Sequence, residues 1–155
     1  MYPQTHFLFS FFIALVFAKL GVFDLKIVFF VALVGLFVDF DHYVKFIFKK
    51  KDFNLKHSWN KAVKGVYHGR SFIHHWIGFV VLTLIFAGLY FLNITLFWIF
   101  GLGYYSHLFL DYAHLNFLHI KGKIKFKEFG LVEKISKFEV LLDVFLIIAI
   151  ILFIL

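Results

Sequence analysis

The chain contains no cysteine, and only 16% of its residues are charged. Without thiols it can form no disulfide, no cysteine-ligated iron–sulfur cluster and no thiolate zinc site, so any bound metal must use nitrogen and oxygen ligands. The low charged fraction, set against 63% apolar residues, is unsuited to a water-exposed surface. The solvent that this composition indicates is lipid.

Acidic residues are also scarce, since nine Asp and Glu are set against sixteen Lys and Arg, for a formal charge of +7. The lysines are interleaved with Phe, Ile and Leu beside long apolar runs. Anionic lipid headgroups are therefore the expected partner, and nucleic acid is not. Residues 1–6 carry no Lys or Arg, and no clear small-residue cleavage site follows, so we expect the first apolar helix to be retained.

Five apolar segments are each about as long as a bilayer core requires. They cover residues 7–23, 27–43, 73–92, 94–110 and 140–155. The expected fold class is an all-α integral membrane protein of about five transmembrane helices, with residues 1–155 forming a single membrane domain. In the second segment the continuous apolar run ends at Val38, and polar residues follow.

Short and long connections alternate between these segments. The breaks at residues 21–26 and 93 are short, whereas those at 45–72 and 112–139 are long and hold all but two of the sixteen Lys and Arg. By the positive-inside rule, the two long connections and the N-terminus lie on the cytoplasmic side of the inner membrane. An odd number of spans then places the end of the last segment on the far side.

The two long connections are expected to lie along the membrane interface, because both combine lysines with apolar residues. Residues 44–64 mix aromatic side chains with lysines. Residues 120–129 alternate apolar and charged side chains, which suits a short amphipathic strand or hairpin as well as an extended interfacial peptide.

Histidines and aspartates gather at the segment ends that share the cytoplasmic face, and the opposite face has no histidine. These residues are the candidate metal ligands His6, Asp39, Asp41, His42, His74, His107 and Asp111. Chance would scatter such groups over both faces. We therefore expect them to converge on one site on the cytoplasmic side.

The spacing and the chemistry of these residues favour a metal. Asp39 and His42 are three residues apart and His107 and Asp111 four, so each pair projects from one face of a helix. Ionisable groups at membrane depth cost about 2.5–3.5 kcal/mol each, which a bound cation offsets. A set of His and carboxylate ligands suits Zn, with Mn or Fe as alternatives. The number of ligands indicates two ions, or one ion with a general base, and the alternative is a hydrogen-bonded Asp–His network without metal.

Other polar and small residues near these ligands allow two interpretations each. Arg70, the only arginine, lies four residues before His74 and can clamp a phosphate or meet a lipid headgroup. Gly101 and Gly103 either allow a close approach between helices or merely pack. Ser106 either orients a ligand or bonds to its own helix backbone.

In this order the motifs resemble the family of membrane-bound metal-dependent hydrolases, small bacterial and archaeal inner-membrane proteins that include LexA-associated members. The matching pieces are Thr5-His6, Asp39-Phe40-Asp41-His42, Arg70 with His74, and the run from Gly103 to Asp111. The resemblance implies the same seven metal ligands, with Arg70 close by. The chain departs from the family pattern at Gly69 and His75, which stand where the family commonly has histidine and serine. His68 or His75 can take a missing role, and His114 is a further secondary candidate.

The function expected from these features is hydrolysis of a phosphoester in a lipid or another anionic amphiphile by a metal-bound hydroxide at the cytoplasmic face. Asp41 and Arg70 are the expected catalytic residues, moving a proton and binding the phosphate. Two alternatives remain. One is a non-catalytic membrane protein that binds metal or haem, and the other is a structural or recruiting membrane protein without a metal.

Overall fold

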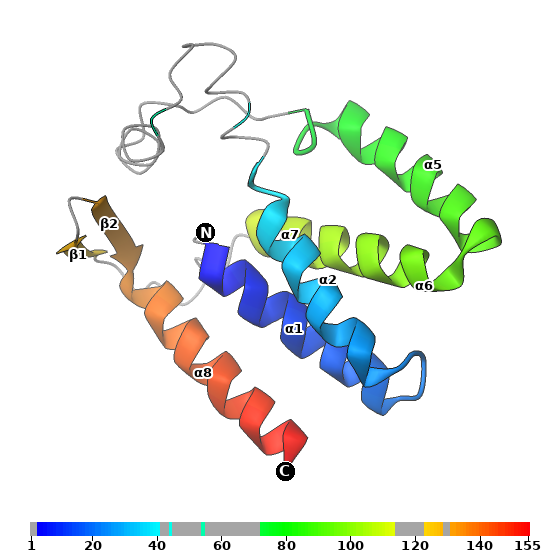
Figure 1. The fold of residues 1–155 in the computed structure, drawn as a ribbon. Coiled ribbons are helices and arrows are strands. Elements are labelled where there is room, and N and C mark those ends of the chain that lie inside the picture. The colour runs from blue at the N-terminus through cyan, green and yellow to red at the C-terminus, as the bar shows by residue number, and fades with distance from the viewer. Residues whose placement is uncertain (1–2, 41–43, 45–53, 55–71, 114–122, 129–130) are drawn as a thin grey trace.

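The computed structural model describes residues 3–40, 44, 54, 72–113, 123–128 and 131–155. The elements of this part are helices apart from one β-hairpin (Figure 1), so the all-α expectation holds except for the hairpin. Their bounds are α1 Pro3–Lys19, α2 Leu25–Phe37, α5 Trp76–Leu92, α6 Ile94–Phe97, the π-helix η1 Trp98–Leu102, α7 Gly103–Tyr112, β1 Lys123–Glu128, β2 Leu131–Ser136 and α8 Lys137–Ile154.

α1 and α2 form an antiparallel pair joined by a tight connection. Gly21 has a φ of 77°, and its N–H and that of the next residue donate to carbonyls of the last turn of α1, which is a Schellman ending. Asp24 then begins α2, because its Oδ1 accepts a hydrogen bond of 2.9 Å from the N–H of Lys26. The reversal predicted at residues 21–26 is thus present.

α1, α2 and α7 pack against one another, and two glycines set how closely they approach. A Cβ added at Gly35 would lie 2.7 Å from Cβ of Ser10, and one added at Gly103 would lie 2.7 Å from Cβ of Val34. Neither Cβ fits without a shift, so the helix backbones meet at close range. Gly103 provides the close approach considered above, whereas a Cβ at Gly101 would meet its nearest neighbour at an ordinary 3.7 Å.

The fourth apolar segment is one helical run with a change of geometry inside it. Asn93 ends α5 and begins α6, because its Oδ1 accepts hydrogen bonds from the N–H groups of Thr95 and Leu96 at 3.0 and 3.1 Å. α6, η1 and α7 then follow without a gap to Tyr112. The π-helix inserts extra backbone into the run, which alters the direction in which the side chains of α7 point.

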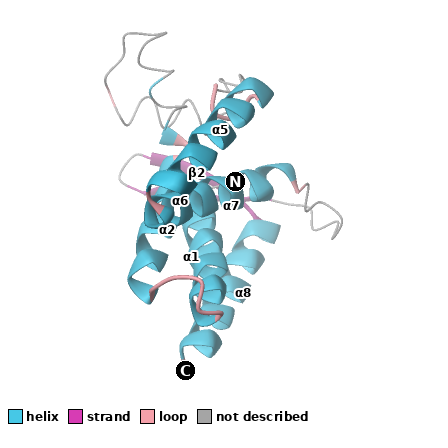
Figure 2. Ribbon diagram, turned by 90° about the vertical axis from the view of Figure 1, so that its right-hand side faces the viewer, coloured by secondary structure: helices cyan, strands magenta, loops and turns pink. Residues whose placement is uncertain are grey.

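The hairpin leads into α8 (Figure 2). β1 and β2 pair antiparallel, with Lys123 opposite Ser136 and Glu128 opposite Leu131. A strand, one of the conformations predicted for residues 120–129, is confirmed over 123–128, and its hairpin partner lies at 131–136. Ser136 begins α8 by accepting a hydrogen bond of 3.0 Å from the N–H of Glu139, and α8 then packs along α1.

Within the described ranges, no helix is both long enough and apolar enough to cross a membrane. The five predicted spans correspond in position to α1, α2, α5, the α6–α7 run and α8, and each differs from the prediction. α1 and α5 have 17 residues each and α2 has 13, ending at Phe37 rather than 43, while η1 divides the fourth. α8 has 18 residues but includes Lys137, Glu139 and Asp143.

The polar ends of the helices lie together at one end of the molecule. The first turn of α1, the end of α2 and the end of α7 are neighbours there, with the start of α8 beside α1 (Figure 1). The C-terminus lies at the opposite end. This is the arrangement that alternating short and long connections imply, and it brings distant polar residues together.

Candidate metal centre

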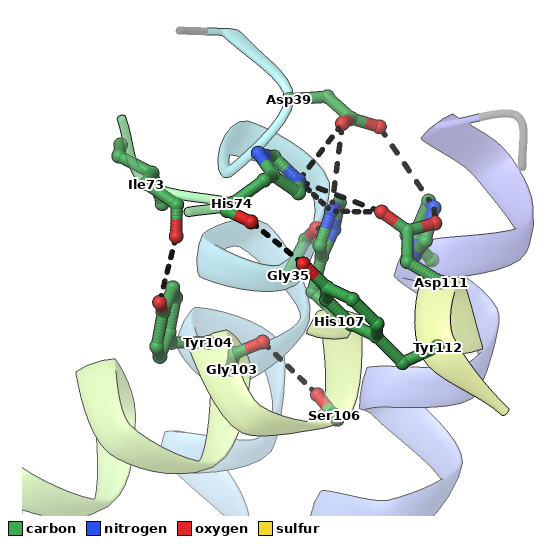
Figure 3. A network of polar contacts seen from close by, with 11 residues as sticks. Gly35, Asp39, Ile73, His74, Gly103, Tyr104, Ser106, His107, Asp111 and Tyr112 are labelled. Carbon is green, nitrogen blue, oxygen red and sulfur yellow. Dashed lines mark hydrogen bonds and ion pairs between the residues drawn. The ribbon is translucent and has the colours of Figure 1, made fainter. Parts of the chain in front are cut away.

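Two histidines and two aspartates from separate segments form a compact group at this end (Figure 3). Asp39 follows α2, His74 lies in the turn before α5, and His107 and Asp111 are one turn apart on α7. One ligand atom from each residue lies within 4.8 Å of all the others. His107 is 0% exposed and His74 6%, whereas the aspartate side chains are 25% and 24% exposed. The group is therefore buried on its histidine side and open on its carboxylate side.

The distances between these atoms match those around a single ion. Nε2 of His74 lies 3.1 Å from Nε2 of His107. These two nitrogens lie 3.6 and 3.4 Å from Oδ1 of Asp39, and each lies 3.4 Å from Oδ2 of Asp111. Four tetrahedral ligands at about 2.0–2.1 Å from a zinc ion are about 3.3–3.4 Å apart. The donor atoms thus fit a metal site of two histidines and two aspartates.

The backbone of α2 fixes the tautomer of His107. Nδ1 of His107 lies 2.8 Å from the carbonyl oxygen of Gly35. Because a carbonyl can only accept, Nδ1 carries a proton, so whenever the ring is neutral its lone pair lies on Nε2, which faces the group. A hydrogen bond from the outer ring nitrogen to a carbonyl is the usual support of a metal-ligating histidine.

Two tyrosines of α7 hold the turn that carries His74. The hydroxyl of Tyr104 donates to the carbonyl of Ile73 at 2.8 Å, and that of Tyr112 donates to the carbonyl of His74 at 2.6 Å (Figure 3). The turn is further fixed by Gly78, because a Cβ there would lie 2.8 Å from the carbonyl carbon of Phe72. The orientation of His74 therefore depends on α7 and on the first turn of α5.

His6 of α1 lies against this group from the other side. Its side chain is 0% exposed, and its ring stacks on that of His107 with centroids 3.8 Å apart. Nε2 of His6 lies 3.3 Å from Oδ1 of Asp111 and 3.8 Å from Oδ2 of Asp39. In the described part of the chain, neither ring nitrogen of His6 has a hydrogen-bond partner. Fully buried imidazoles are nearly always hydrogen-bonded or bound to an ion, so His6 is unusual.

His6 and Asp111, which each lie one residue outside a predicted span, have ionisation states suited to binding a cation. Burial lowers the pKa of His6, so its ring is neutral at neutral pH and has a free lone pair. Burial alone would raise the pKa of Asp111, but the imidazoles of His107, His6 and His74 outweigh it and hold that pKa below its usual range. The carboxylate is therefore ionised.

The structure brings five of the seven candidate ligands together. The other two, Asp41 and His42, fall outside the described residues, as do Arg70, His68 and His114. His75 is exposed and begins α5, where its Nδ1 accepts a weak hydrogen bond of 3.4 Å from the N–H of Ile77. Ser106 donates to the carbonyl of Gly103 at 3.0 Å, so the backbone interpretation of this serine is confirmed.

Sequence reasoning overlooked the residues that support the ligands. Tyr104 stands three residues before His107 and Tyr112 directly after Asp111, so both were visible as close neighbours of the ligands in the sequence. Gly35 acts through its carbonyl, which leaves no trace in a pattern of side chains. A backbone acceptor of this kind becomes visible only once α2 and α7 are packed.

A family model described as YdjM inner membrane protein matches residues 1–116. The match covers α1 to α7 and includes every residue of the group described above. The chain belongs to the YdjM inner membrane protein family. The YdjM description assigns the protein to the inner membrane, as predicted, and names no reaction. No curated protein and no solved structure matches the chain.

The hairpin and α8 lie beyond the region matched to YdjM, yet α8 reaches the edge of the site. The hydroxyl of Thr5, next to His6, donates to Oε1 of Glu139 at 3.0 Å, and Glu139 is only 5% exposed. Glu139 stands three residues after Ser136, and its own N–H donates to the hydroxyl of that residue. α8 thus helps to position the first turn of α1.

Proposed function

We propose that this YdjM family member is a membrane-embedded, metal-dependent hydrolase acting on a phosphoester of a lipid or another anionic amphiphile. The observation that carries the proposal is the convergence of His74, His107, Asp39 and Asp111 at distances suited to one ion. Zn suits this donor set best, with Mn or Fe as alternatives. The partly exposed carboxylates leave a side from which a substrate can approach.

A divalent ion in this position would supply a Lewis acid and lower the pKa of a bound water toward 7. The chain contributes the rest. Gly35 holds the lone pair of His107 toward the centre, and Tyr104 and Tyr112 hold His74 there. The two carboxylates balance the charge of a cation. Asp41 and Arg70 remain the proposed proton acceptor and phosphate ligand.

The proposed location is the cytoplasmic face of the inner membrane, in a multi-pass chain with a cytoplasmic N-terminus. The YdjM description supports the membrane, and the outer faces of α5 and α8 expose contiguous apolar side chains. They include Trp76, Phe79, Val80, Leu84, Phe91, Phe145, Ile148, Leu152 and Ile154. Lipid is the partner proposed for these faces, and anionic headgroups are proposed for the basic connections.

Phosphate release from phosphatidic acid in mixed micelles would test the activity, using detergent-purified protein reconstituted separately with Zn, Mn or Fe. We expect turnover in the wild type and its loss in His107→Ala, while Leu92→Ala, at an 84% exposed position at the far end of α5, serves as the control. Metal bound without phosphate release from this substrate or from a soluble phosphomonoester would favour the non-catalytic metal-binding alternative. A His107→Ala variant with the wild-type rate would overturn the proposal.

A further inference from the structure

In each of the two carboxylates of the centre, the two oxygens lie near different histidines. Oδ1 of Asp39 lies 3.4 Å from Nε2 of His107, while the other oxygen, Oδ2, lies 3.8 Å from Nε2 of His6. Oδ2 of Asp111 lies 3.4 Å from Nε2 of His107, and its other oxygen, Oδ1, lies 3.3 Å from Nε2 of His6. Each carboxylate therefore directs one oxygen at the His74–His107 pair and the other at His6.

His6 supplies an independent reason to look for a second ligand position. The group of four leaves it out, and yet its side chain is wholly buried with both ring nitrogens lacking a hydrogen bond among the described residues. Buried polar side chains are nearly always hydrogen-bonded or bound to an ion, so this ring calls for an explanation. Its stacking on His107 holds the ring in place, with Nε2 toward the second carboxylate oxygens.

We propose that this end of the molecule holds two divalent ions bridged by Asp39 and Asp111, one ligated by His74 and His107 and the other by His6. Two carboxylates that bind syn to a pair of ions accommodate the spacing of about 3.5–4 Å that is usual in two-metal sites. Separations of 3.3 and 3.8 Å from Nε2 of His6 to the second oxygens are those of ligands that share one ion.

This inference rests on the metal site of the proposed function and adds the second ion, its ligand and the bridging role of the aspartates. Bridging also explains why two anionic carboxylates converge in a largely buried place. Two cations balance them, whereas a single ion between the four residues would leave the second oxygen of each carboxylate facing the ring of His6 rather than an ion. His6 is then a ligand rather than a packing residue.

The test uses the full chain in detergent, stripped with a chelator and reconstituted with Mn²⁺. Metal content by mass spectrometry and electron paramagnetic resonance are measured together. We expect two ions per wild-type chain with an exchange-coupled spectrum, and one ion per chain with an uncoupled spectrum in His6→Ala. The control variant Leu92→Ala, at an 84% exposed position at the end of α5 far from His74, should keep both ions and the coupling.

One ion per wild-type chain, or two ions without exchange coupling, would overturn the inference. If His6→Ala does not fold, the wild-type coupling together with a His6→Gln variant still decides it, since coupling requires two ions that share bridging ligands. The readout is independent of turnover. Coupled ions without hydrolysis would leave the two-ion site standing and remove the hydrolase proposal, whereas hydrolysis with one ion per chain would do the reverse.

Discussion

At the scale of single residues, the geometry of the candidate centre depends on groups outside the set of ligands. The carbonyl of Gly35 sets the tautomer of His107, and two tyrosine hydroxyls hold the backbone on either side of the His74 Cα. Such supporting groups convert flexible ligands into a preformed site, and their loss weakens metal binding about 10- to 100-fold. Conservative variants of these groups can test their effect on metal affinity separately from their effect on folding.

Tyr112→Phe should lower metal affinity about tenfold or more while leaving the helices intact, because it removes the 2.6 Å hydrogen bond to the carbonyl of His74 and keeps the ring. Isothermal titration with Zn²⁺ in detergent measures the affinity, and far-ultraviolet circular dichroism checks the fold. Tyr90→Phe is the matched control, because Tyr90 is 52% exposed and lies on α5 away from the centre. Equal affinities for the wild type and Tyr112→Phe would count against the support role.

At the scale of elements, the centre exists because α1, α2 and α7 approach one another unusually closely. Gly35 and Gly103 remove the side chains that would separate the helices, and a buried pair of serines joins α1 to α7 beneath the ligands. The π-helix η1 precedes α7 and sets the direction in which His107 and Asp111 project. The packing of these helices therefore also determines the positions of the ligands.

Gly35→Ala should destabilise the protein by about 1–3 kcal/mol, because the new Cβ would lie 2.7 Å from Cβ of Ser10 and would push α1 from α2. Gly88→Ala on α5 is the control, since a Cβ there meets nothing within 4 Å, and it should stabilise by about 0.5–1 kcal/mol. Thermal unfolding in detergent measures both. The packing argument fails if the two variants shift the midpoint in the same direction.

The serine pair should show strong non-additivity. Ser106 donates to the carbonyl of Gly103, so Ser10 must donate to Ser106 across the 2.7 Å contact. Ser106→Ala leaves the buried hydroxyl of Ser10 without its acceptor and should cost about 1–3 kcal/mol. Adding Ser10→Ala removes the orphaned group and should recover part of that loss. A double-mutant cycle of unfolding free energies measures the coupling, and strictly additive values would contradict it.

At the scale of the whole molecule, the polar end and the apolar flanks divide the chain into two regions of different chemistry. The site lies at one end with the first turn of α1, while the outer faces of α5 and α8 expose apolar side chains. In a YdjM inner membrane protein, we expect lipid around these flanks and the polar end at the cytoplasmic boundary. This orientation can be measured directly.

The chain has no cysteine, so single cysteines report on orientation without background. Leu20→Cys, in the connection between α1 and α2, should react with a membrane-impermeant maleimide from the periplasmic side of intact cells. Asn54→Cys, in the first long connection, should react only after the membrane is opened. Leu20 is 73% exposed and Asn54 is exposed, so access within the protein does not limit either reaction. The reverse pattern would invert the proposed topology.

The sequence by itself determined which residues are chemically unusual and at which end they meet. Ionisable groups beside apolar runs and the alternation of short and long connections follow from local composition, so the seven ligands predicted from the sequence include the five that the structure brings together. The strand over 123–128 could be anticipated for the same reason, because alternation with period two is a local signal.

Only the tertiary structure decided how long the helices are and which atoms face one another. α2 ends at Phe37 and η1 interrupts the fourth segment, because capping and helix packing, rather than hydropathy, set these boundaries. The carbonyl of Gly35 meets a histidine 72 residues further along the chain, and the opposed oxygens of Asp39 and Asp111 depend on contacts with α1. Sequence pattern encodes which groups are present, whereas their mutual distances arise from packing.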